Sequence, residues 1–109
     1  MTPEAKVKLA VKKALATLGI LPASRAGLFP EDAQGWYFMP VSGGMGVHGV
    51  PDVLGHFRGR FFAVETKAPG RKPTALQELQ IKTLRETGAL VFVVSTGADI
   101  DFMVQVLGR

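Results

Sequence analysis

Apolar residues recur every three or four positions in three stretches of the chain, the spacing of a helix that packs one face against a core. The first stretch has Thr2 as a candidate N-cap, Pro3 in the first turn and Gly19 as a stop. The second begins at Thr74 and ends before Gly88, and the third begins at Thr96. The pattern therefore predicts three helices.

Shorter apolar and aromatic runs lie between these stretches and suit strands. They are Trp36–Val41, Val50–Phe57, Arg60–Lys67 and Ala89–Val94. The last run is wholly apolar, which favours a buried central strand. The predicted order is α-β-β-β-α-β-α, an α/β fold in which helices flank a small mixed sheet.

Two further segments show neither the spacing of a helix nor the apolar run of a strand. Residues 20–34 contain two prolines, one glycine and mixed charge, so we expect a loop without chemistry. Ser42–Gly49 is glycine-rich but lacks the Gly-Lys-Ser/Thr ending of a phosphate-binding P-loop. We expect a mobile loop there that lets a backbone or a ligand come close.

Composition narrows the classes of protein that remain. The 109 residues fit one domain spanning 1–109, and 47% are apolar, enough for a core. No apolar run is long enough to cross a membrane and no signal peptide is recognisable, so we expect a cytoplasmic protein. The absence of cysteine excludes disulfides, thiolate metal sites and cysteine nucleophiles. The net charge of +4 favours a polyanionic partner.

The hairpin predicted around Arg58-Gly59 carries the chemistry. A two-residue turn pairs Phe57 with Arg60, and counting back along both strands sets Asp52 opposite Glu65. Directly opposed side chains in an antiparallel pair have Cβ atoms about 5 Å apart. Two carboxylates would then share one small space.

Like charges at this distance destabilise a sheet unless a cation lies between them. The strand period of two puts Lys67 on the same face as Glu65. Hard oxygen ligands favour Mg²⁺ or Mn²⁺, which can polarise a phosphodiester and activate water. The alternative is that Asp52 ends a loop beside Pro51 and that Glu65 and Lys67 are an exposed edge pair. A turn of odd length would remove the alignment.

These motifs resemble a known nuclease family. Pro51-Asp52 followed by Glu65-Thr66-Lys67 resembles the PD-(D/E)XK nuclease superfamily, whose fold is restriction-endonuclease-like. The fuller string is similar to the VRR-NUC branch, the virus-type replication-repair nucleases, through Gly49-Val50-Pro51-Asp52, Glu65-Thr66-Lys67, Thr74-Ala75-Leu76-Gln77 and Leu84-Arg85-Glu86-Thr87-Gly88-Ala89. The resemblance spans about residues 36 to 96, plus the first helix by topology.

The resemblance implies a role for each matched residue. Asp52 and Glu65 would be metal ligands, together with the backbone carbonyl of Thr66. Lys67 would orient or help to deprotonate the attacking water and stabilise charge on the phosphate.

Two further residues, Gln77 and Glu4, each have two possible roles. Gln77 matches the family's glutamine, but it can also complete a capping box with Thr74, and the two roles are compatible. Glu4 matches an acid that many superfamily members carry on the first helix, or it serves the start of that helix.

Basic residues predicted to flank the site could bind phosphates, or form a solvated rim. They are Arg58, Arg60, Arg71 and Lys72, with His48 as a further candidate that also suits an ordinary loop. Strand aromatics at Trp36, Tyr37 and Phe38 could stack bases, although such residues more often belong to a core.

The resulting hypothesis is a Mg²⁺- or Mn²⁺-dependent DNA endonuclease. Small stand-alone members of the family are similar to phage proteins that work as homodimers on branched DNA such as four-way junctions, which would place this one in the host-cell cytoplasm. The alternatives are a flap, nick or general duplex nuclease, a catalytically silent DNA-binding module of the same fold, and a structural or assembly protein.

Overall fold

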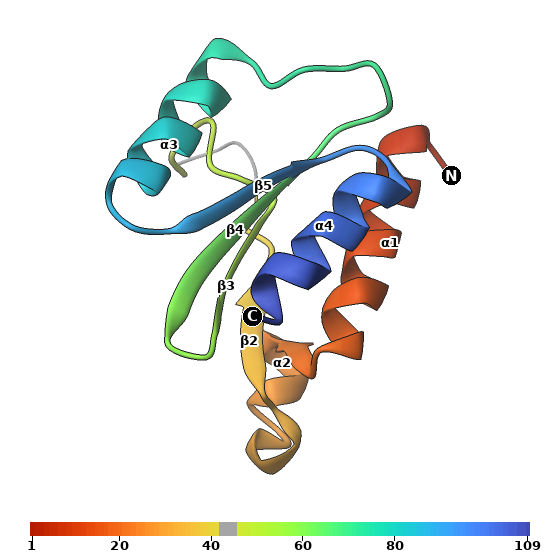
Figure 1. Cartoon of the computed structure of the whole chain (residues 1–109), viewed down its shortest axis with the longest axis vertical. Helices are drawn as coiled ribbons and strands as arrows, with labels where there is room; N and C mark the ends of the chain where they lie inside the picture. Colours follow the sequence, from red (N-terminus) through yellow and green to blue (C-terminus); the bar gives the residue numbers. More distant parts are fainter. Residues whose placement is uncertain (42–45) are drawn as a thin grey trace.

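A computed structural model describes residues 1–41 and 46–109 of the chain. A five-stranded sheet forms its centre, with α1 and α4 against one face and α3 against the other (Figure 1). The helices are α1 (Pro3–Thr17), α2 (Ala23–Ala26), α3 (Ala75–Glu86) and α4 (Gly97–Leu107), with a 3-10 turn η1 at Pro30–Asp32, and the strands are β1 (Ile20–Pro22), β2 (Gly35–Phe38), β3 (Val53–Phe57), β4 (Arg60–Thr66) and β5 (Leu90–Val94).

The sheet is mixed and its strands lie in chain order from β1 to β5. β1 pairs with β2 and β4 pairs with β5 in parallel, while β2, β3 and β4 form antiparallel pairs. This arrangement confirms the predicted fold class of a small α/β domain in which helices flank a mixed sheet.

The three predicted helix starts are confirmed by their caps. The Thr2 side chain accepts a hydrogen bond from the Ala5 backbone N–H at 3.1 Å. Thr74 and Thr96 each close a capping box, with Gln77 and Asp99 respectively. Because each cap satisfies N–H groups that have no partner within the helix, it fixes where the helix begins.

The core has two unequal parts. Val7, Val11 and Leu15 of α1 pack with Met103 and Leu107 of α4 on one face of the sheet. On the other face a smaller cluster joins α3 to the sheet through Ile81, Ala63 and Val91. The first part fixes the rotation of α1 about its own axis, and this decides which α1 side chains reach the end of the sheet.

The prediction that residues 20–34 form a loop was wrong. This segment holds β1, α2 and η1, and β1 adds a parallel strand next to β2. β1 has only three residues and ends at Pro22, too short for a period of two to be seen. Its pairing is set by contact with β2, more than ten residues on, which local propensity does not encode.

The prediction that Ala89–Val94 is a central strand was also wrong, since β5 lies at the edge of the sheet. Its run is wholly apolar because helices cover both of its faces. Phe92 and Val94 pack in the cluster with α1 and α4, whereas Val91 packs with Ile81 of α3. A strand covered on both faces reads as apolar wherever it lies in the sheet.

The glycine-rich stretch Ser42–Gly49 is described only from Gly46 onward, because 42–45 lie outside the described residues. Within 1–41 and 46–109, no helix is both long and apolar enough to cross a membrane.

Candidate active site at the open end of the β3–β4 hairpin

The turn between β3 and β4 has the predicted two residues, and it sets the register. Arg58 and Gly59 adopt φ values of 53° and 76°, as a tight turn with left-handed residues requires. The paired residues run from Phe57↔Arg60 to Val53↔Val64. One step beyond Val53, at the open end of the hairpin, this register sets Asp52 opposite Glu65.

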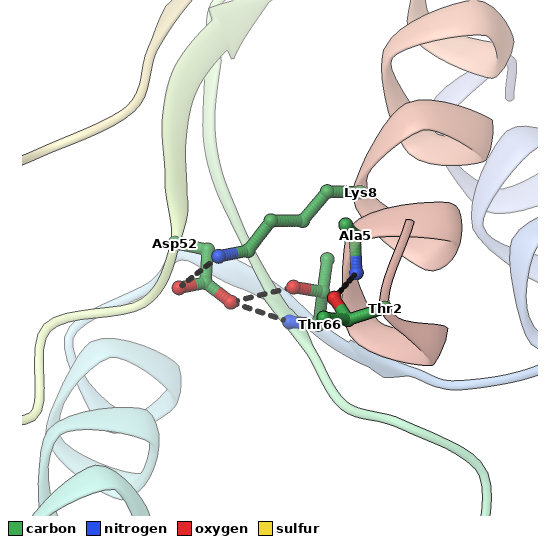
Figure 2. Close-up of polar contacts among 5 residues, drawn as sticks. All are labelled: Thr2, Ala5, Lys8, Asp52 and Thr66. Atoms are coloured by element: carbon green, nitrogen blue, oxygen red, sulfur yellow. Dashed lines mark hydrogen bonds and ion pairs between the residues drawn. The ribbon is translucent and has the colours of Figure 1, made fainter.

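Asp52 lies directly before β3, and its side chain binds Thr66 at the end of β4. Its Oδ2 atom accepts hydrogen bonds from the Thr66 backbone N–H at 2.9 Å and from the Thr66 hydroxyl at 2.7 Å (Figure 2). Burial works against ionisation of Asp52. Contact with Glu65, the two bonds from Thr66 and the charge of Lys8 outweigh it, so the pKa of Asp52 lies below its ordinary value. Asp52 is therefore charged at neutral pH.

Glu65 stands in a very different environment. It is only 1% exposed, and within the described part of the chain its Oε2 atom has no hydrogen-bond partner. Burial, contact with the Asp52 carboxyl and the charge of Glu4 raise the pKa of Glu65 to about 9, while Lys67 opposes this shift. An orphaned, buried carboxyl oxygen next to a second carboxylate costs stability unless a cation joins them.

These donors suit a hard divalent cation. Asp52 and Glu65 offer carboxylate oxygens from two neighbouring strand ends, the ligand type that Mg²⁺ and Mn²⁺ prefer. Among residues 1–41 and 46–109, no three His, Asp or Glu side chains lie close enough to hold a metal together. A cation here would complete its shell with backbone oxygen and water, as Mg²⁺ commonly does.

Lys67 follows β4 directly and is anchored through its backbone, whose N–H donates to the Val94 carbonyl at 2.9 Å. Its charge is close enough to Glu65 to favour that group's ionised form. Lys67 also lines a hollow with Glu4, Arg71 and Lys72. Glu4, Arg71 and Lys72, three of the candidates from the sequence, thus line one hollow together with Lys67.

The first turn of α1 forms the other wall of this hollow, beside the connector between β4 and α3 (Figure 1). The Thr2 cap fixes that turn, which carries Glu4, and the charge of Glu4 contributes to raising the pKa of Glu65. Glu4 therefore lies in the electrostatic field of the acidic pair.

Lys8 is a residue of this site that the sequence did not single out. Its Nζ atom lies 3.9 Å from Oδ1 of Asp52, and Figure 2 shows the side chain reaching from α1 toward that carboxylate. The sequence did hold one signal: Lys8 lies four residues after Glu4, and residues four apart on a helix lie on the same side of it. Nothing in the strand motifs points to it.

Gln77 completes the capping box of α3. Its Oε1 atom accepts from the Thr74 backbone N–H at 2.9 Å, and its own N–H donates to the Thr74 hydroxyl at 3.3 Å. Gly49, just before Pro51-Asp52, packs against the same turn. A Cβ at Gly49 would come within 2.7 Å of the Leu76 carbonyl carbon and oxygen. The start of α3 is thereby held beside the segment that carries Asp52.

Arg58 and Arg60 do not flank the acidic pair, as the sequence had suggested. They lie at the turn of the hairpin, about 17 Å along the strands from Asp52. Arg58 donates to the Gly108 carbonyl at 2.9 Å and Arg60 to the Leu107 carbonyl at 2.7 Å. Both guanidinium groups therefore serve the C-terminal end of α4.

The remaining candidates border the open end. Arg71 and Lys72 are exposed in the connector beside Lys67. His48 is exposed and lines a second hollow with Asp52 and Phe38. In β2, Tyr37 belongs to the core while the flanking Trp36 and Phe38 are each 41% exposed.

Comparison with known proteins gives a likeness in structure. Neither the protein-family models nor the curated proteins match this sequence. A solved structure described as "VRR_NUC domain" has the same fold with a TM-score of 0.70 and 26% sequence identity, and the likeness covers 96% of this chain and 97% of that one. The likeness includes α1, the hairpin and α3, which carry the residues described above. The chain therefore has the fold of a VRR-NUC domain, and this likeness supports the family resemblance that the motifs at its strand ends predicted.

Proposed function

We propose that the chain is a Mg²⁺- or Mn²⁺-dependent endonuclease that hydrolyses phosphodiester bonds in DNA. The observation that carries this proposal is the buried Glu65 carboxyl with an unpartnered Oε2, beside the ionised Asp52, at the strand ends of a VRR-NUC-type fold. An arrangement that costs stability, two residues along the chain from the Lys67 that lines a hollow with Arg71 and Lys72, is typical of a functional site.

Asp52 and Glu65 would hold the divalent ion, with the Thr66 carbonyl as a further backbone ligand. When bound, such an ion supplies a Lewis acid that polarises a phosphodiester and lowers the pKa of a water molecule. The hydrogen bonds from Thr66 hold the Asp52 carboxylate in place, so its orientation requires no adjustment during the reaction.

Lys67 would contact the attacking water or an oxygen of the scissile phosphate. Its backbone bond to Val94 fixes where the side chain starts, and its ammonium offsets the negative charge that develops on the phosphate. Arg71 and Lys72 would hold neighbouring phosphates at the same opening, a contact that needs charge and no base sequence. His48, which lines a hollow with Asp52, would contact the same DNA strand. Glu4 would contribute to the charge of the site. Gln77 would hold the start of α3 in place through its capping box.

The substrate that we propose is branched DNA, cut by a homodimer. One domain of this size covers a small part of a duplex, and a four-way junction has two-fold symmetry that two identical sites can match. Flaps, nicks and ordinary duplex are the competing substrates for the same chemistry.

A panel of DNA substrates tests this function. Four-way junction, flap, nicked, duplex and single-stranded DNAs are incubated with the purified chain in Mg²⁺, Mn²⁺ or EDTA. We expect metal-dependent cutting with a preference for the junction, and sedimentation velocity should report a dimer. Glu65→Gln, which keeps the shape of the side chain, is the matched inactive control.

Each other result rejects part of the proposal. Equal cutting of all substrates would leave a nuclease but reject junction preference. Binding without metal-dependent cutting would indicate a silent DNA-binding module. An absence of DNA affinity at low salt would favour a structural protein.

A further inference from the structure

Lys8 projects from α1 at the border of its buried face. The buried residues Val7 and Val11 fix the rotation of the helix, and at about 100° per residue Lys8 falls beside them. The Lys8 side chain is 36% exposed and its ammonium points to Asp52 (Figure 2). The other α1 lysines, Lys6, Lys12 and Lys13, are exposed.

The two oxygens of Asp52 differ in what they have left to offer. A carboxylate oxygen has two acceptor positions, and Thr66 fills both positions of Oδ2 with its N–H and its hydroxyl. The oxygen that remains for a cation is Oδ1, which is the atom 3.9 Å from the Lys8 ammonium. Lys8 and a divalent ion therefore compete for the same atom.

We propose that Lys8 is a second lysine of the active site, which neutralises Oδ1 of Asp52 until a divalent cation displaces it and then binds an oxygen of the DNA phosphate. This inference rests on the proposed function. Displacement follows because an ammonium and a divalent ion repel each other at one carboxylate oxygen. The freed ammonium stays tethered to α1 within reach of Asp52, where a phosphate is the nearest anion that DNA would bring.

The first test measures metal binding without DNA. Calorimetric titration of the intact chain with Mn²⁺, and separately with Mg²⁺, is compared for wild type, Lys8→Met, Lys8→Arg and Lys13→Met. Loss of the competing charge should tighten the binding of both ions to Lys8→Met by about three- to fivefold, the equivalent of a partly exposed ion pair. Lys8→Arg keeps the charge and should bind as wild type does. Lys13→Met removes the same charge from the opposite side of α1 and should change nothing.

The second test measures cutting at saturating metal, so that affinity for the ion no longer matters. Lys8→Met should lower kcat by about tenfold or more, since a charge that contacts the phosphate is lost. Lys8→Arg should recover most of that loss, and Lys13→Met should cut at the wild-type rate. Tighter metal binding combined with slower cutting is the signature of this role, because damage to the fold would weaken both.

Contrary outcomes are distinct. If Lys8→Met binds both ions no more tightly than wild type, the competition does not exist and the inference is overturned. If it binds them more tightly but cuts at the full rate, the phosphate contact is overturned. If wild type binds neither ion more tightly than Asp52→Asn, the proposed metal site itself fails and Lys8 is not the cause. Should Lys8→Met fail to melt cooperatively, Lys8→Gln carries the same comparison.

Discussion

The two ends of the β3–β4 hairpin use charged residues in opposite ways. At the turn, the guanidinium groups of Arg58 and Arg60 donate to the last carbonyls of α4. At the open end, Asp52 and Glu65 oppose each other, and among the residues that the structure describes the buried Oε2 atom of Glu65 finds no hydrogen-bond partner. Charge that is satisfied indicates a structural role, whereas charge that the fold leaves unbalanced indicates a site where something must bind.

The largest expected effect is on cutting at the open end. Lys67→Met should lower kcat by about a thousandfold, because the proposed mechanism places this ammonium on the phosphate and the variant removes it. Its melting temperature should stay close to that of wild type, since Lys67 is anchored by its backbone and not by its side chain. Rates measured on the best DNA substrate decide this. A variant that still cuts within tenfold of the wild-type rate would remove Lys67 from the chemistry.

The next effect concerns two glycines with similar backbone angles, one near each end. Gly49 has φ +81° and packs against the Leu76 carbonyl, whereas Gly59 has φ +76° with open space around it. Gly49→Ala should lower the free energy of unfolding by about 3 kcal/mol, from strain plus overlap, and Gly59→Ala by about 1 kcal/mol, from strain alone. Urea unfolding of both variants measures the difference. Equal losses would mean that Gly49 does not clamp α3.

A smaller effect should depend on pH. Because burial and Asp52 raise the pKa of Glu65 to about 9, the stability of the metal-free chain is complete while Glu65 is protonated in both the folded and the unfolded state, below about pH 4.5. It should fall as the pH rises from there toward 9. Glu65→Gln cannot ionise, so in EDTA its free energy of unfolding should be close to that of wild type near pH 5 and should exceed it by a growing margin as the pH rises toward 8. A gap that stays constant with pH would contradict the raised pKa.

The smallest effect belongs to the turn end. Arg60→Ala removes one partly buried hydrogen bond to α4 and should lower the free energy of unfolding by about 1 kcal/mol. Cutting per folded molecule and the Mg²⁺ affinity should stay at their wild-type values, because Arg60 is far from Asp52. Arg71→Ala is the matched control, which should weaken DNA binding and leave stability unchanged. A loss of DNA affinity in Arg60→Ala would assign the turn to the interface after all.

Sequence reasoning was most successful where local rules decide the structure. A two-residue turn with glycine fixed the hairpin register, and threonine caps fixed the helix starts, because both depend on neighbouring residues. It failed where distant contacts decide. β1 exists only through β2, and Lys8 reaches Asp52 only through the packing of α1.

The misplacement of Arg58 and Arg60 has a different cause. Their proximity to Glu65 in the sequence suggested proximity in space, but a strand carries the chain away from its turn by about 3.3 Å per residue. The register that aligned Asp52 with Glu65 already implied this distance. The unsatisfied Oε2 of Glu65, by contrast, depends on the burial of a whole side chain and has no counterpart in a sequence motif.

The connector between β4 and α3 is fastened at both of its ends. Lys67 is bonded to β5 through its backbone, and Thr74 is locked in the capping box of α3. Between them lie only the six residues 68–73, so Arg71 and Lys72 are tethered at a fixed reach from the acidic pair. In the proposed nuclease, the length of this connector would set the distance between the phosphate contacts of Arg71 and Lys72 and the acidic pair. Lengthening it by a few glycines would shift the cut along the DNA strand without altering the atoms that perform it.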